Sequence, residues 1–89
     1  MVTAVILVNV ERHKLNEVIR ELMQIDGITE VHSVAGEYDM VAIARVKDNQ
    51  QLSSIVADKM CSQIEGILHT KNLVSLGSYF KYDAEQLFQ

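Results

Sequence analysis

A four-residue segment, Gly36 to Asp39, brings together a glycine, a phenol and two carboxylates. Asp39 is an ionised acceptor suited to an ammonium group, and Tyr38 offers both an apolar ring face and a hydroxyl. Gly36 lets a ligand approach the backbone closely because it has no side chain. Glycine and aspartate are also common turn residues, so the same segment fits a plain hairpin turn. The segment alone leaves both interpretations open.

The other reactive side chains lack the spacing that metal binding or covalent catalysis requires. His13, His32 and His69 have no metal-type spacing, and Cys61 is the single cysteine. Cys61 has no paired histidine or aspartate nearby in the sequence, which indicates a structural role. We find no glycine-rich phosphate loop and no carboxylate pair at catalytic spacing. The sequence therefore predicts no catalytic residue, no metal site and no cofactor.

Length and charge narrow the class of protein. The 89 residues predict one domain over 1–89, with no linker and no DNA-binding domain. The net charge is −4, and the 8 basic residues are scattered along the chain rather than clustered. Nucleic-acid binding needs clustered cations that displace counterions, so we expect no direct binding to nucleic acid.

Cysteine usage and the lack of long apolar stretches indicate where the protein works. No stretch approaches the ~18 consecutive apolar residues of a membrane span. The apolar start of the chain lacks the basic residues and the cleavage site of a signal peptide. A single cysteine allows no internal disulfide and fits a reducing compartment. We therefore expect a cytoplasmic protein that does not enter a membrane.

Hydrophobic periodicity predicts six elements. Short apolar, β-branched runs indicate strands, whereas apolar residues at three- and four-residue spacing indicate amphipathic helices. The predicted elements are a strand over 2–10, a helix over 11–24 with Gly27 at its C-terminal cap, strands over 28–35 and 40–46, a helix capped by Asp48 or Asn49 and ended by Gly66, and a strand over 67–81 with a bulge or bend at Gly77.

This element order predicts an α+β fold of the ferredoxin-like βαββαβ type. Right-handed crossovers in one antiparallel four-stranded sheet place both helices on the same face. The same arrangement places the first and third strands in the middle of the sheet. Each middle strand then has one face under the helices and one face that is bare.

Both faces of these two middle strands are mostly apolar. One parity consists of Ala4, Ile6, Val8 and Val10 in the first strand and Met40, Ala42, Ala44 and Val46 in the third. The other parity still contains Val5, Leu7, Val41 and Ile43. The bare face of an isolated sheet should be polar, and an exposed apolar patch marks an interface. Because the sequence has no third helix to cover it, we expect a second copy packed sheet against sheet in a two-fold dimer.

Several motifs together carry a family resemblance. Residues 30–41 read as a valine-rich strand, a glycine-acidic-tyrosine-aspartate turn and an apolar strand. Asp26-Gly27-Ile28 precedes the second strand, Ile64-Glu65-Gly66-Ile67 precedes the fourth, and Thr70 and Val74 follow within it. In order and spacing, about residues 2–81 resemble the ligand-binding domain of the leucine-responsive/asparagine (Lrp/AsnC) regulators, also called the RAM domain.

The resemblance implies an effector-binding module with a role in transcription regulation of amino acid metabolism. Members of the family form dimeric α/β barrels that assemble further into octamers or decamers. They bind small effectors, usually amino acids, in clefts between dimers. Full-length members also carry a helix-turn-helix domain, which is missing before the first strand of this sequence. We therefore expect a stand-alone form, or an excised domain, that could act through full-length Lrp/AsnC regulators.

The resemblance also assigns a site to the chain. The expected ligand contacts are Gly36, Tyr38 and Asp39 of one chain, with Thr70, Leu73, Val74 and Ser75 of the last strand supplied by a neighbouring chain. Asp39 would bind the ammonium group of the amino acid. Leu73 and Val74 could equally be plain interface packing.

Two other functions share this topology. Small dimeric α/β-barrel enzymes include monooxygenases and isomerases, whose sites usually use an inward-facing His, Asn or Trp. This sequence has no Trp, and its inward positions are aliphatic, which favours a non-catalytic protein. ACT-like amino acid sensors share the strand order but pair their sheets edge to edge. The apolar second face argues against that form of assembly.

Overall fold

A computed structural model describes residues 1–81 and contains the predicted succession of strands and helices. The last eight residues of the domain predicted over 1–89 lie outside the described residues. The elements are β1 Val2–Val10, η1 Arg12–Lys14, α1 Leu15–Leu22, β2 Ile28–Ser33, β3 Met40–Val46, α2 Asn49–Ser53, η2 Ser54–Met60, α3 Cys61–Gln63 and β4 Ile67–Val74. Among residues 1–81, no helix combines the length and the apolar character that crossing a membrane requires.

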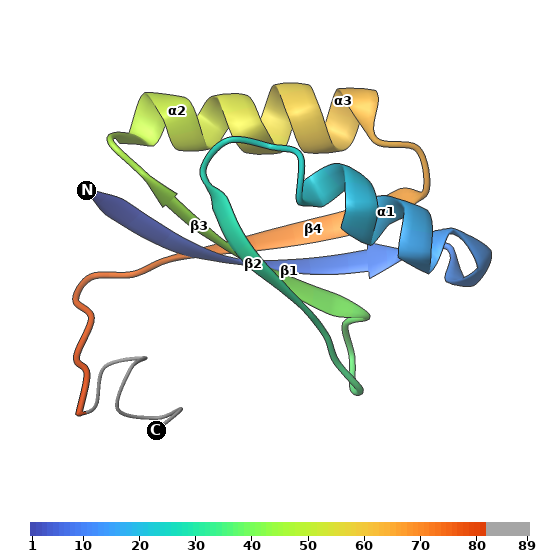
Figure 1. The fold of residues 1–89 in the computed structure, drawn as a ribbon, viewed down its shortest axis with the longest axis horizontal. Helices are drawn as coiled ribbons and strands as arrows, with labels where there is room; N and C mark the ends of the chain where they lie inside the picture. Colours follow the sequence, from blue (N-terminus) through green and yellow to red (C-terminus); the bar gives the residue numbers. More distant parts are fainter. Residues whose placement is uncertain (82–89) are drawn as a thin grey trace.

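The four strands form one antiparallel sheet in the order β2-β3-β1-β4. Strands β1 and β3 occupy the middle, as predicted. Helix α1 and the long helix formed by α2, η2 and α3 lie on the same side of the sheet (Figure 1). The predicted ferredoxin-like fold is therefore confirmed.

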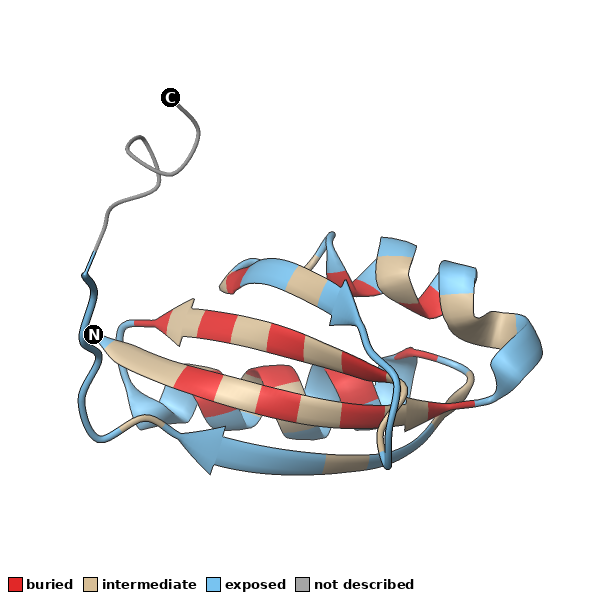
Figure 2. Cartoon of the chain, turned by 90° about the horizontal axis from the view of Figure 1, so that it is seen from below, coloured by how far each residue is buried: buried red, intermediate tan, exposed pale blue. Residues whose placement is uncertain are grey.

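The core lies between the sheet and the helices. It contains the even-numbered residues of the middle strands, from Ala4 to Val10 and from Met40 to Val46, all of which are buried. Val18 and Leu22 of α1 and Met60 of the long helix are completely buried against them. Figure 2 shows the alternation of buried and half-buried residues along the two middle strands.

The opposite side of the sheet is apolar at its centre. The register places Val5 between Ile43 and Leu73, and it places Leu7 beside Val41. We call these five residues the outer face. The four on the middle strands are half-buried, and Leu73 is 48% exposed. Within residues 1–81, no helix covers this side of the sheet, as the sequence pattern predicted (Figure 1).

Three elements are shorter than predicted. Helix α1 begins at Leu15 because residues 12–14 form a 3-10 turn, and β2 ends at Ser33. Strand β4 ends at Val74, seven residues early. The Ser75 amide still donates to the Thr3 carbonyl, but β1 starts at Val2. Residues after Ser75 therefore have no residues of β1 left to pair with. The bulge or bend expected at Gly77 lies outside β4: the chain bends at the neighbouring residue Leu76, whereas the register shift of β4 falls near residues 67–69.

The long helix begins at Asp48, whose carboxylate accepts a hydrogen bond from the Gln51 amide at 2.8 Å. Its middle part, η2, is π-helical, which is rare and typical of functional sites. In a continuous α-helix, position 59 would lie on the buried stripe that starts at Leu52 and Ile55. The wider turn moves the stripe by one residue, so Met60 is completely buried and Lys59 is exposed.

This shift predicts that truncating the side chain at position 60 lowers the stability of the fold strongly, whereas truncating it at position 59 hardly changes it. Met60→Ala should lower the free energy of unfolding by about 2–5 kcal/mol, because it opens a cavity in the core. Lys59→Ala should change it by no more than about 0.5 kcal/mol, because Lys59 lies at the surface. Urea unfolding at one fixed chain concentration measures both values. Equal losses for the two variants would contradict the π-helical register.

Candidate functional site

Asp39 connects the β2–β3 turn to the end of β1. Its carboxylate atom Oδ2 accepts a hydrogen bond from the Val10 amide at 2.9 Å. Its own amide donates to the Val8 carbonyl, and its carbonyl accepts from the Val34 amide, both at 3.0 Å. The second carboxylate atom, Oδ1, has no donor among residues 1–81. Asp39 therefore has a structural role and still offers one oxygen to a ligand.

Tyr38 packs against the first part of β4. Its ring stacks on the His69 ring with the centroids 6.5 Å apart and the planes 22° from parallel. His69 is paired with Asn9 across the sheet, so the stack spans the end of β1. Sequence reasoning missed the role of His69, because only the strand register brings it to the turn. The only signal in the sequence was that His69 directly precedes Thr70, which was predicted to contact the ligand.

Gly36 leaves the backbone of the turn open. Its φ angle of +140° lies in a region that favours glycine, and a Cβ added there would meet no atom within 4 Å. The positive φ angle, rather than a lack of space for a side chain, therefore explains why this position is a glycine. The open side of the backbone is accessible to a small molecule.

The predicted residues of β4 do not all join this turn within one chain. Thr70 is paired with Val8, close to the Asp39 contacts, whereas Val74 is paired with Ala4. Four strand residues separate these two points, which is roughly 14 Å. Leu73 belongs to the outer face, on the side of the sheet opposite Thr70 and Val74. One chain thus brings Gly36, Tyr38, Asp39 and Thr70 to one end of the sheet, and Leu73, Val74 and Ser75 lie at the other end.

Polar side chains border the outer face on both edges of the sheet. On β2, His32 Nε2 lies 3.0 Å from Glu30 Oε1, and this hydrogen bond lowers the pKa of Glu30. On β4, His69 and Lys71 occupy the same side of the sheet. Among residues 1–81, no three His, Cys, Asp or Glu side chains are arranged to hold a metal ion. The outer face is therefore an apolar patch that polar side chains border on both edges of the sheet.

The family follows from the sequence match and agrees with this fold. Residues 3–84 match the model of the Lrp/AsnC ligand-binding domain. The chain belongs to the Lrp/AsnC family. One relative of this Lrp/AsnC domain is the HTH-type transcriptional regulator FL11 of Pyrococcus furiosus, which is 33% identical over 75 residues. These residues cover 84% of the chain and 48% of FL11, so the chain spans about half the length of the curated relatives that it matches.

Solved structures resemble the whole Lrp/AsnC domain. TTHA0845 from Thermus thermophilus superposes with a TM-score of 0.84 at 30% identity, covering 91% of this chain and 100% of that one. The complex of the transcriptional regulator NMB0573 with L-Met, from Neisseria meningitidis, has a TM-score of 0.78. Its 18% identity shows the fold alone, over 85% of this chain and 50% of that one.

The hydrogen bond at Asp39 generates a prediction for this Lrp/AsnC domain. Asp39→Ala should lower the free energy of unfolding by about 1–3 kcal/mol, because the Val10 amide loses its acceptor. Asp39→Asn keeps an acceptor oxygen and should cost less. Hydrogen exchange at the Val10 amide gives a local measurement, which should speed up in Asp39→Ala and change little in Asp39→Asn. Unchanged exchange in Asp39→Ala would disprove the contact.

Proposed function

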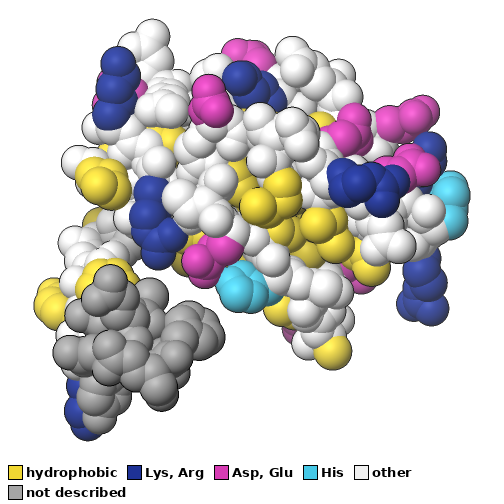
Figure 3. Space-filling view, viewed as in Figure 1, with side chains coloured by type: hydrophobic (Ala, Val, Ile, Leu, Met, Phe, Trp, Pro, Cys, Tyr) yellow, Lys and Arg dark blue, Asp and Glu magenta, His cyan; other side chains and the backbone are white. Residues whose placement is uncertain are grey.

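We propose that this domain binds a free amino acid and thereby takes part in transcription regulation, without a catalytic step of its own. The supporting observation is the match of residues 3–84 to a family of ligand-binding domains, whose named relatives are transcriptional regulators. The proposal includes one effector-binding domain over residues 1–89 and a cytoplasmic location. It also includes action with full-length Lrp/AsnC regulators rather than direct contact with nucleic acid. On the face shown in Figure 3, Lys and Arg side chains are scattered among acidic ones, which suits that indirect role.

The proposed site has two halves. In one chain, Asp39 Oδ1 accepts the ammonium group of the amino acid, beside the open backbone of Gly36 and the ring of Tyr38. The other half comes from a neighbouring chain, because the far end of β4 lies roughly 14 Å from the turn. At this far end the Ser75 hydroxyl, which donates to the Gly77 carbonyl at 3.0 Å within one chain, turns to donate to the carboxylate of the ligand, whereas Thr70 contacts the ligand from the turn end of the sheet. Val74 of the same strand forms an apolar wall for the ligand side chain, and Leu73, on the opposite side of the sheet, packs within the outer face.

The outer face supports a dimer as the unit that builds this site. Each of its aliphatic side chains would contribute roughly 1.5–3 kcal/mol if a second sheet buried it completely. The polar border around an apolar centre is typical of protein interfaces. Leu76, Tyr79 and Phe80 follow β4 and are also exposed, on a segment that leaves the sheet on the side away from the helices (Figure 1). On this proposal the dimers assemble further into octamers or decamers.

A thermal-shift screen with the twenty amino acids tests the proposal. Methionine is the first candidate, because NMB0573, which shares the fold, is described as an L-Met complex. A ligand at 100 times its Kd stabilises the folded protein by about 2.7 kcal/mol, so the melting temperature should rise. Asp39→Asn should abolish the rise, because it removes the charge and keeps an acceptor for Val10. Glu37→Gln, which removes the other carboxylate of the turn, is the matched control and should keep it.

Two results would contradict this function. One is a screen in which no amino acid raises the melting temperature. The other is a full response in Asp39→Asn, which would leave the ligand bound elsewhere.

A further inference from the structure

The segment that follows β4 carries large apolar side chains that take no part in the core of their own chain. Leu76 is fully exposed, Tyr79 is 94% exposed and Phe80 is 77% exposed. We call residues 76–80 the arm, and none of its five residues carries a charge. Apolar side chains that gather at the surface in this way mark a contact with a partner.

The arm extends toward the side of the sheet that the proposed dimer covers. Its starting point is fixed, because the Ser75 amide donates to the Thr3 carbonyl at 2.8 Å, at the end of the sheet where β1 begins. From there the arm leaves the sheet on the side away from the helices (Figure 1). The outer face lies on that same side. The arm therefore runs toward the space that a second sheet would occupy.

The charged and titratable residues of the strands determine how two outer faces can meet. All of them lie on the outer side of the sheet: Glu30 and His32 on β2, Arg45 on β3, and His69 and Lys71 on β4. Within residues 1–81, Glu30 is the only carboxylate in the four strands, and Lys71 has no ion pair. The carboxylate and the unpaired ammonium group thus lie on opposite edges of the sheet.

A two-fold axis can stack two such sheets in two ways. If the axis crosses the strands, each edge strand lies over its own copy, and both Lys71 side chains gather at one edge. If the axis runs along the strands, β4 of one chain lies over β2 of its partner. Each Lys71 then faces the edge that carries Glu30. Complementary charges specify the orientation of an interface, so they favour the second arrangement.

The second arrangement brings the arm to a hollow of the partner. Because both sheets then point the same way, the arm starts beside the end of the partner where β1 begins and β3 ends. A hollow of about 420 Å³ lies there, lined by Met1, Arg45, Val46 and Lys47. We call it the end hollow. Its lining combines two apolar side chains with the aliphatic stems of two cations.

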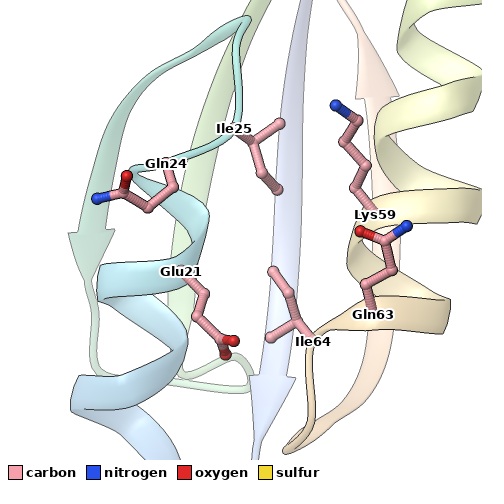
Figure 4. Close-up of a pocket in the computed structure, with 6 residues that line it drawn as sticks. All are labelled: Glu21, Gln24, Ile25, Lys59, Gln63 and Ile64. Atoms are coloured by element: carbon pink, nitrogen blue, oxygen red, sulfur yellow. The ribbon is translucent and has the colours of Figure 1, made fainter.

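The other hollows are poor matches for the arm. The hollow between α1 and the long helix is lined by Glu21, Gln24, Ile25, Lys59, Gln63 and Ile64 (Figure 4). The adjoining hollow adds the guanidinium group of Arg20. Charged and amide groups therefore dominate both, whereas the arm is uncharged. A further hollow between the long helix and β4 also lies on the helix side of the sheet, which the arm leaves behind.

We infer that the arm of each chain docks in the end hollow of its partner, so that the two chains exchange arms. Tyr79 and Phe80 pack on the apolar lining, and the cations of Arg45 and Lys47 face their rings. Arg45 Nη1 donates to Thr29 Oγ1 at 2.6 Å, which holds the guanidinium group at this end of the sheet. The inference rests on the sheet-to-sheet dimer proposed above and adds a second contact to it.

Cysteine crosslinking between two different full-length chains tests the exchange. Both chains carry Cys61→Ser, which removes the exposed native thiol. One chain also carries Phe80→Cys, and the other carries Lys47→Cys and an affinity tag. Oxidation of the mixed chains should link the tagged chain to the untagged one. Lys59→Cys, which places a thiol on the long helix, is the matched control for Lys47→Cys and should give no link to Phe80→Cys.

Truncation of the arm gives an independent measurement. Tyr79→Ala and Phe80→Ala should each raise the Kd for dissociation into single chains about tenfold, because each removes an aromatic contact with the partner. Met23→Ala truncates an exposed apolar side chain on the helix side and should leave the Kd unchanged. All three positions are exposed within one chain, so the far-UV circular dichroism should stay the same.

Charge reversal tests the arrangement of the two sheets. Lys71→Glu should raise the same Kd about threefold to tenfold, because it places a second carboxylate opposite Glu30 of the partner subunit. Glu30→Lys in the same chain should restore the Kd, because opposite charges then meet again. If the axis crossed the strands instead, neither change would alter which charges meet across the interface.

Two results would overturn the exchange of arms. One is the absence of a link between Phe80→Cys and Lys47→Cys in chains that sediment as dimers. The other is an unchanged Kd in both arm variants. Either result would leave the sheet-to-sheet dimer in place, whereas an unaltered chain that sediments as a single chain would remove the dimer and the exchange together. The amino acid screen at the turn is a separate readout.

Discussion

The two middle strands are apolar on both faces, but the helices can cover only one of them. This constraint determines most of the structure. Even-numbered residues of β1 and β3 form the core beneath the helices, and odd-numbered residues such as Val5 and Ile43 form the outer face. A domain of this size buries a modest core, so an uncovered aliphatic surface is a substantial loss of stabilisation. A second sheet is the simplest partner that matches both the shape and the chemistry of this face.

The turn at Asp39 links this architecture to the proposed ligand site. One carboxylate oxygen holds the end of β1 through the Val10 amide, and the other is left without a protein donor among residues 1–81. The same side chain thus positions the turn and offers a charge to a ligand. Because the far end of β4 lies at the opposite end of the sheet, the proposed site needs a second chain to be complete. Assembly and binding are therefore parts of one proposal.

The sequence predicted the fold well wherever a pattern was local. The bounds of β1 and β3 match, because apolar runs end at polar residues, and the strand order follows from the handedness of the crossovers. Features that depend on a distant partner were not predictable. The end of β4 is fixed by where β1 starts, and the stacking of His69 on Tyr38 is fixed by the strand register. The structure brings Gly36, Tyr38 and Asp39 together in the β2–β3 turn, and their role in ligand binding stays a prediction.

Sedimentation equilibrium of the full chain at micromolar concentration tests the central claim most directly. The account predicts a particle of at least twice the 10.0 kDa mass of one chain. It also predicts that Ile43→Lys, which places a charge in the middle of the outer face, shifts the mass toward that of a single chain. A stable particle of 10.0 kDa for the unaltered chain would contradict it, because the outer face would then be stable in water without a partner.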